Sequence, residues 1–145
     1  MRNVIFTVPG EPCGKARPRV VDGHAYTPHK TKAYEHRIAI ACRQANPGIK
    51  PWPAGTPLTM TVIARCGIPK SATRAQRKAM QSLDVLPTKK PDVDNIAKAV
   101  ADALNGIAFH DDSQIVGMLV CKQYSDSPGL LVDISGPDLE DDDAQ

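Results

Sequence analysis

The most regular pattern of apolar and polar positions in this 145-residue chain runs from Asp92 to Ile107. Apolar residues recur at helical spacing, at positions 96, 100, 103, 104 and 107. A polar stripe, made of Asp94, Lys98 and Asp102, follows at intervals of four on another face. Asn105-Gly106 then begins the end of the segment. The pattern predicts an amphipathic helix that packs its apolar stripe against a sheet.

Other apolar runs predict that sheet and two further helices. Strand composition or alternation marks Val4–Val8, Leu58–Ala64, Ile115–Tyr124 and Leu130–Ser135. The last two are joined by the Ser125–Gly129 turn and are expected to form a hairpin. Helical spacing marks Thr31–Ala45, and a short helix is expected over Arg74–Ser82. Glu11–Pro28 is expected to be a long loop that carries a short hairpin across Asp22-Gly23.

These elements predict one α+β domain over residues 1–137, with a small mixed sheet packed with helices. A chain of 145 residues is long enough for one domain with a core and too short for two ordinary ones. The composition, 41% hydrophobic but only 4% aromatic, indicates a mainly aliphatic core. Residues 67–90 are interpreted as an excursion from that core. Residues 138–145 form an acidic tail that is expected to be disordered.

Charge is divided unevenly along the chain, although the formal net charge is only +2. Residues 1–90 hold 16 Lys and Arg against four acids, whereas residues 91–145 hold two Lys against 12 acids. A basic surface of this kind indicates a polyanionic partner, because phosphate contacts supply much of the affinity for nucleic acids. An ordinary solvated surface is the alternative, and charge alone does not separate the two.

Membrane segments, secretion signals and cysteine-based sites are all disfavoured by the sequence. No apolar run approaches the ~20 residues that span a bilayer, and the N-terminal segment turns polar too early for a secretory signal. We therefore expect a cytoplasmic protein without a membrane segment. The four cysteines contain no C-x-x-C pair, which favours free thiols over a disulfide frame or a zinc site.

Carboxylates stand at both ends of the helix predicted from residue 92. Asp92 and Asp94 begin it, and Asp111 and Asp112 follow it. An acid at a helix N-terminus caps the helix and interacts favourably with its dipole, and the second pair fits an ordinary solvated turn. If the strand from Ser113 packs beside the helix, however, Asp112 approaches the first pair. Three crowded carboxylates favour a hard divalent cation, and Mg²⁺ prefers oxygen ligands.

Lys98 follows Asp94 by one helical turn. Spacing alone favours an ordinary i, i+4 salt bridge between the two. The second interpretation is a phosphodiester reaction, in which a metal ion orients and activates water and a lysine balances charge on the transferring phosphoryl group. The spacing leaves both interpretations open.

The segment KPDVDNIAKAVADALNGIAFHDDSQIV, residues 90–116, resembles the signature of the RusA family of Holliday junction resolvases. That pattern has a D-x-D-N opening, a Lys at the next turn, a D-A-L continuation and a D-D-[SA]-Q turn before a strand. More loosely, GEPCGKARPRV and AYTPHKTKAYEHRI are similar to the family's G-x-P-x-x-K-x-R-P-R and Y-x-P-x-x-T-x-x-Y-E segments. The excursion over residues 67–90 departs from the shorter family members.

The resemblance implies a magnesium-dependent endodeoxyribonuclease of DNA recombination and repair. Such an enzyme acts as a homodimer on four-way junctions and makes paired, symmetric nicks. By position in the motif, Asp92, Asp94 and Asp112 correspond to the family's catalytic, metal-binding carboxylates. Lys98 corresponds to its catalytic lysine, and Asp111 matches the first acid of the D-D pair without a firm role.

DNA contacts are expected from the basic loop before the first helix, at Lys15, Arg17 and Arg19, because of the charge division. A homodimer would match the approximate two-fold symmetry of a four-way junction. Two other functions stay open: a metal-dependent nuclease of the same fold that prefers other branched DNA, and a non-catalytic DNA-binding module whose acids cap helices. A D-x-D nucleotide-sugar transferase would need a larger domain. Metal dependence separates an enzyme, which loses turnover in a chelator, from a binding module.

Overall fold

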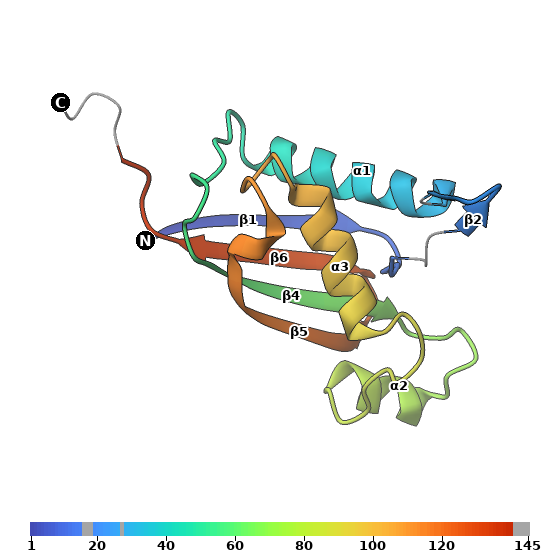
Figure 1. The fold of residues 1–145 in the computed structure, drawn as a ribbon. Helices are drawn as coiled ribbons and strands as arrows, with labels where there is room; N and C mark the ends of the chain where they lie inside the picture. The colour runs from blue at the N-terminus through green and yellow to red at the C-terminus, as the bar shows by residue number, and fades with distance from the viewer. Residues whose placement is uncertain (16–18, 27, 141–145) are drawn as a thin grey trace.

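A four-stranded mixed sheet forms the centre of the computed structural model, which describes residues 1–15, 19–26 and 28–140. The strands are β1 (Arg2–Pro9), β4 (Leu58–Gly67), β5 (Ile115–Ser125) and β6 (Gly129–Gly136). Their spatial order is β1-β6-β4-β5. β6 runs antiparallel to both β1 and β4, whereas β4 and β5 are parallel (Figure 1). The prediction of a mixed sheet in an α+β fold is confirmed.

The hairpin predicted for the last two strands is wrong, because β4 lies between β5 and β6. Ser125 at the end of β5 pairs with Gly67, and Gly129 at the start of β6 pairs with Arg65 on the other side of β4. Extended residues span roughly 3.3 Å each, and neighbouring strands lie about 4.8 Å apart. The short connection is therefore long enough to cross the end of one strand.

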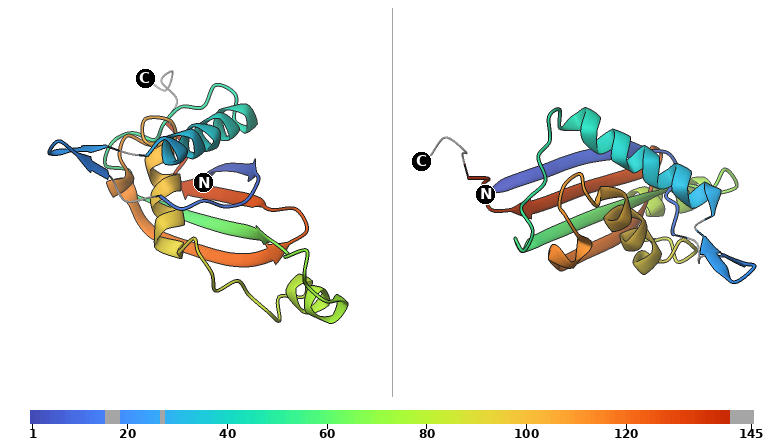
Figure 2. Two further views of the ribbon diagram at one scale, coloured as in Figure 1. Left: turned by 90° about the vertical axis from the view of Figure 1, so that its right-hand side faces the viewer. Right: turned by 45° about the horizontal axis from the view of Figure 1, so that its top comes forward.

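Two helices, α1 (His29–Ala45) and α3 (Val93–Leu104), cover one face of the sheet (Figures 1 and 2). The apolar stripe predicted for α3 faces that sheet, since Ile96, Val100 and Leu104 are all 0% exposed. Alternate residues of the strands point toward the two helices and pack against them. Those at most 2% exposed are Val4, Val8, Leu58, Met60, Val62, Ala64, Cys66, Leu130, Val132 and Ile134.

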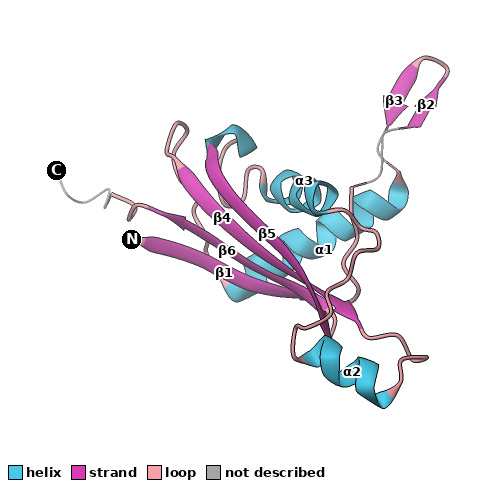
Figure 3. Cartoon of the chain, turned by 90° about the horizontal axis from the view of Figure 1, so that it is seen from below, coloured by secondary structure: helices cyan, strands magenta, loops and turns pink. Residues whose placement is uncertain are grey.

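Two smaller elements project from the end of the sheet at which α3 begins. The hairpin predicted across Asp22-Gly23 is confirmed as β2 (Arg19–Val21) and β3 (His24–Tyr26). The short helix α2 (Arg74–Gln81) has no buried residue, and Figure 3 shows it set apart from α1 and α3. Seen from this end, the hairpin projects on one side and α2 on the other, with the start of α3 between them (Figure 2, left).

The chain after β6 begins by packing against the domain. Pro137 accepts a 2.7 Å hydrogen bond at its carbonyl from Nε1 of the buried Trp52, and Leu139 packs against the core. The prediction of a disordered acidic tail also covers residues 141–145, which lie outside the described residues. All four cysteines are free thiols. None of the helices in the described ranges is long and apolar enough to cross a membrane.

Candidate active site

The first turn of α3 presents two carboxylates that are not used for capping. Asp92 occupies the N-cap position, yet its side chain makes no capping hydrogen bond. Asp94 lies in the first turn, and both residues are exposed. Among the described residues, neither side chain has a hydrogen-bond or ion-pair partner. Their oxygens are therefore free to bind a ligand, and capping does not explain the pair.

The loop after β1 packs directly onto this turn. The amide N–H of Lys15 donates a 3.0 Å hydrogen bond to the carbonyl of Asn95. A Cβ at Gly14 would lie 2.8 Å from Cβ of Asn95 and 3.1 Å from Cβ of Pro91, so only glycine permits this approach. The glycine-containing N-terminal motif thus packs beside the acids, although the two segments are far apart in the sequence.

The turn that carries Asp112 is held in place by the buried side chain of Gln114, which is 6% exposed. Its Oε1 accepts hydrogen bonds from the amides of His110 and Asp111, at 2.9 and 3.1 Å. Its Nε2 donates to the carbonyls of Pro53 and Thr56, at 2.9 and 3.1 Å. A fully bonded buried amide of this kind fixes its surroundings. The turn therefore presents Asp112 in a defined position beside α3.

Asp111 and Asp112 differ in their surroundings although they are neighbours. Asp111 Oδ2 accepts a 2.5 Å hydrogen bond from the hydroxyl of Ser113, and this bond lowers the pKa of its carboxyl. Asp111 therefore stabilises the turn itself. Asp112 faces Lys98, whose Nζ lies 3.8 Å from its Oδ2.

Lys98 is paired with acids other than the one that its spacing favours. Its Nζ lies 3.4 Å from Oδ1 of Asp102 and 3.8 Å from Oδ2 of Asp112. No ion pair between Lys98 and Asp94 occurs in the described part of the chain, so the interpretation as an Asp94 salt bridge is wrong. The helix places Asp102 one turn further on, and the Gln114 turn brings Asp112 to the same ammonium group. Lys98 thereby remains 58% exposed at its side chain and available to a substrate.

Asp102 also binds Lys15, and this pair is more buried than the one with Lys98. Nζ of Lys15 lies 2.5 Å from Oδ2 of Asp102 and 3.3 Å from Oε1 of Glu35, with side chains 16 to 20% exposed. The hydrogen bond to Asp102 raises the pKa of Lys15, and Glu35 adds to the effect. Asp102 therefore bridges two lysines. Lys15 lies on its more buried side, and Lys98 lies on its more exposed side.

The expected DNA contacts at Lys15, Arg17 and Arg19 fall in three different situations. Lys15 already pairs with the two carboxylates just described. A contact between Lys15 and a DNA phosphate stays a prediction, and the phosphate would have to compete with these carboxylates. Arg17 lies outside the described residues. Arg19 begins β2.

Two clefts lie on either side of Asp94. The first has a volume of about 710 Å³, and its charged lining consists of Asp94, Lys98 and Asp112. Its remaining lining is provided by α3 and by the start of β5. The second cleft, of about 810 Å³, contains two acids and three cations, namely Asp92, Asp94, Lys15, Lys30 and Lys90. Opposite charges thus meet across the first turn of α3.

The chemistry of these oxygens suits a hard divalent cation, because Mg²⁺ binds a few carboxylates and retains waters or substrate phosphates in its remaining positions. Within the described ranges, however, no three Asp, Glu, His or Cys side chains already converge into a metal-binding group. Asp94 and Asp112 share one cleft, and Asp92 lies in the adjoining one. Water and phosphate oxygens would have to complete any coordination shell.

Sequence reasoning assigned no individual role to Asp102 or Gln114. Asp102 was visible only as the third member of the polar stripe, and Gln114 only as the last letter of the D-D-[SA]-Q turn. Lys122 was not singled out at all, yet its Nζ donates to the carbonyls of Lys89 and Pro91 at 2.8 and 3.2 Å. It ties the segment that leads into Asp92 onto β5.

Comparison with known proteins gives two matches over this region. The model of the family described as Endodeoxyribonuclease RusA matches residues 9–135, which include both clefts and the Gln114 turn. A Bacillus subtilis (strain 168) protein, named Uncharacterized protein YqaN, is 38% identical over 133 residues. The alignment covers 88% of this chain and 92% of that protein.

Proposed function

The chain belongs to the RusA endodeoxyribonuclease family, and from this premise we propose that it is a magnesium-dependent resolvase of four-way DNA junctions. It would act in the cytoplasm in DNA recombination and repair and make paired, symmetric nicks. One observation carries the proposal: Asp94, Lys98 and Asp112 line a single cleft, although Asp112 comes from a separate turn. The unpartnered carboxylate of Asp94, beside the Asp112–Lys98 ion pair and its exposed ammonium group, suits a phosphodiester and a divalent cation.

Asp92, Asp94 and Asp112 would hold the magnesium ion. When bound, the ion would supply charge neutralisation and Lewis-acid polarisation of the phosphodiester. Lys98 would contact the transferring phosphoryl group and balance the charge that develops on it. Its exposure of 58% leaves room for that contact.

Asp102 would act as a positioning residue for Lys98. Its Oδ1 faces Lys98 at 3.4 Å, while its Oδ2 is held by Lys15 at 2.5 Å. Because the second contact immobilises the carboxylate, the first can restrain a flexible lysine side chain at the mouth of the cleft. Restraint of this kind reduces the reorganisation needed when the substrate arrives.

The homodimer remains a proposal, and β5 is the surface that supports it best. In the part of the chain that the structure describes, β5 pairs only with β4 and lies at the edge of the sheet. Val116, Met118 and Leu119 on it are 71, 43 and 58% exposed and also line the cleft of Asp94 and Asp112, so the proposed interface would border that cleft. An unprotected edge strand with exposed apolar side chains is a template for pairing with a second chain. Antiparallel pairing of two β5 strands about a two-fold axis would give the unpaired backbone groups of both strands the same hydrogen bonds.

Introducing a charge on this edge is expected to give a monomer. Leu119→Lys places like charges against each other across the proposed two-fold axis, which disfavours the pairing. Sedimentation velocity should show a dimer for the parent and a monomer for Leu119→Lys. Ile40→Lys on α1 is a matched control at a residue 37% exposed, and it should remain dimeric. A dimeric Leu119→Lys protein would exclude β5 as the interface.

The function itself is tested with labelled four-way, three-way and linear duplex DNA, each incubated with magnesium or with a chelator. We expect paired symmetric nicks in the four-way junction with magnesium and no nicking in the chelator. Equal nicking of the three-way substrate would favour a nuclease for other branched DNA. Binding without nicking in any divalent cation would instead favour the non-catalytic module.

A further inference from the structure

Residues 68–90, named here the cationic arm, leave the sheet after β4 and return just before Asp92. The arm contains six Lys and Arg residues and one acid, Asp84. Only Lys90 of these residues belongs to the segment over residues 90–116 that resembles the family signature. None of these six cations lines the proposed catalytic cleft, and Lys90 lines the neighbouring cleft.

Most of the charge on the arm is unpaired. Arg77 forms the arm's one ion pair among the described residues, to Asp126 at 2.9 Å. The other five cations are exposed and have no acidic partner in the described structure, namely Lys70, Arg74, Lys78, Lys89 and Lys90. The single acid, Asp84, accepts a 2.9 Å hydrogen bond from the hydroxyl of Ser82. The arm therefore presents a concentrated positive field to solvent.

The arm is also braced against the domain at α2, near its middle, and at its C-terminal end. Asp126, in the β5–β6 connection, accepts from Arg77 and from Nε2 of Gln81, at 2.9 and 2.7 Å. Within the arm, Thr73 and Gln76 form a complete capping box at the start of α2. Farther along, Lys122 of β5 holds the carbonyl of Lys89 at 2.8 Å. Exposed cations on a tethered helix keep a fixed arrangement relative to the cleft.

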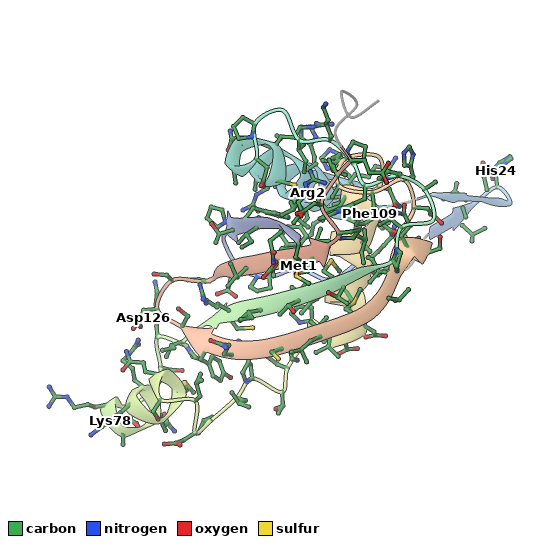
Figure 4. All side chains as sticks on the ribbon, turned by 90° about the vertical axis from the view of Figure 1, so that its left-hand side faces the viewer. Met1, Arg2, His24, Lys78, Phe109 and Asp126 are labelled. Atoms are coloured by element: carbon green, nitrogen blue, oxygen red, sulfur yellow. The ribbon has the colours of Figure 1, made fainter. Side chains whose placement is uncertain are left out.

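The cationic arm lies beside the start of α3, where Asp92 and Asp94 stand (Figure 2, left). Figure 4 shows Asp126 next to α2, Lys78 on α2 itself, and His24 of the β2–β3 hairpin on the opposite side of the sheet. The two projections thus flank the start of α3 (Figure 2, left). Because the arm ends at Lys89 and Lys90, its charge continues to the edge of the cleft that contains Asp92.

We propose that the cationic arm binds the sugar–phosphate backbone of a duplex DNA arm as it leaves the branch point. This inference rests on the proposed function and adds a second, separate DNA contact to it. Unpaired lysines and arginines on an exposed helix contact phosphates without reading sequence. Bracing by Asp126 and Lys122 holds those contacts in a fixed direction from the cleft, so the arm orients the branched substrate as well as attracting it.

The first test removes charge from the arm without shortening it. The double variant Arg74→Gln/Lys78→Gln is compared with Arg43→Gln/Lys50→Gln. The control removes two exposed cations from the C-terminal end of α1 and the loop after it, far from the cationic arm (Figure 1). Affinity for a four-way junction and for linear duplex is measured in chelator over a range of salt. The arm variant should bind about tenfold more weakly, and its slope of log affinity against log salt should fall by roughly 1 to 2. Equal curves for the two variants would overturn the inference.

The second test separates orientation from net charge. Asp126→Ala and Glu140→Ala each remove one exposed acid, so a purely electrostatic attraction predicts equal or tighter binding for both. If the brace orients the arm, Asp126→Ala should bind the junction several-fold more weakly despite its extra positive charge, while Glu140→Ala should not. Tighter binding by Asp126→Ala would contradict the role of the brace.

These results are distinguishable from a failure of the proposed function. Binding in chelator does not depend on nicking, so a parent protein that binds DNA but never nicks leaves the arm inference standing. A parent that nicks junctions normally, with arm variants that bind like their control, overturns the arm inference alone.

Discussion

Asp94→Asn is expected to fold normally, to bind four-way junctions at least as well as the parent, and to lose nearly all nicking. Asparagine keeps the size of the side chain and one oxygen but removes the charge that a magnesium ion requires. Since Asp94 is exposed and has no described partner, the free energy of unfolding should change by less than about 0.5 kcal/mol. Removal of a negative charge also reduces repulsion of the DNA phosphates.

The size of the expected loss separates a metal ligand from a helix residue. Loss of a supporting group around a metal costs about 10- to 100-fold, so loss of a direct ligand should exceed roughly 100-fold in single-turnover nicking. Asp92→Asn and Asp112→Asn should behave alike. Asp133→Asn is the control, because it makes the same change in β6, where Asp133 Oδ1 accepts a 3.0 Å hydrogen bond from Asn3. Parental nicking by a folded Asp94→Asn protein in magnesium would remove Asp94 from the metal site.

The elements of the fold were largely predictable because each has its own local periodicity. The stripe Ile96, Val100 and Leu104 can be buried only if the segment is a helix against a sheet, and all three are fully buried. Strand neighbours were not predictable in the same way. Alternation in β5 and β6 identifies two strands, but the three-residue connection that crosses β4 and a true hairpin turn have similar sequences. Which strand lies between them is decided by packing over the whole sheet.

The candidate site was predictable as far as its residues lie in one contiguous motif. Asp92 and Asp94 are separated by a single residue in the sequence. The proximity of Asp112 to Lys98 depends on the turn held by Gln114. The bridge from Lys15 through Asp102 to Lys98 was not predictable, because Lys15 is 87 residues away from Asp102. No local pattern shows which lysine a helical aspartate will meet from a distant loop.

Lys98→Ala is expected to reduce the nicking rate by about 100-fold while leaving the fold unchanged. Loss of one preorganised electrostatic group that acts on the transition state costs about 3 kcal/mol, which corresponds to that factor. Because the side chain is 58% exposed, its ion pairs should contribute no more than about 1 kcal/mol to stability. Alanine also favours the helix. The loss should appear in the rate at saturating DNA, since Lys98 is assigned to the reacting phosphate rather than to the duplex arms.

A comparison with Asp102→Asn distinguishes a catalytic Lys98 from a merely structural one. Asparagine at position 102 removes the charge that holds Lys98 at 3.4 Å and Lys15 at 2.5 Å but leaves both lysines in the protein. If Lys98 acts on the phosphoryl group, Asp102→Asn should slow nicking less than Lys98→Ala and lower the melting temperature more, because it breaks the partly buried pair with Lys15. Lys98→Arg should restore part of the rate. If Lys98 served only as a partner for Asp102, Lys98→Ala would nick at the parental rate and its sole effect would be a small loss of stability.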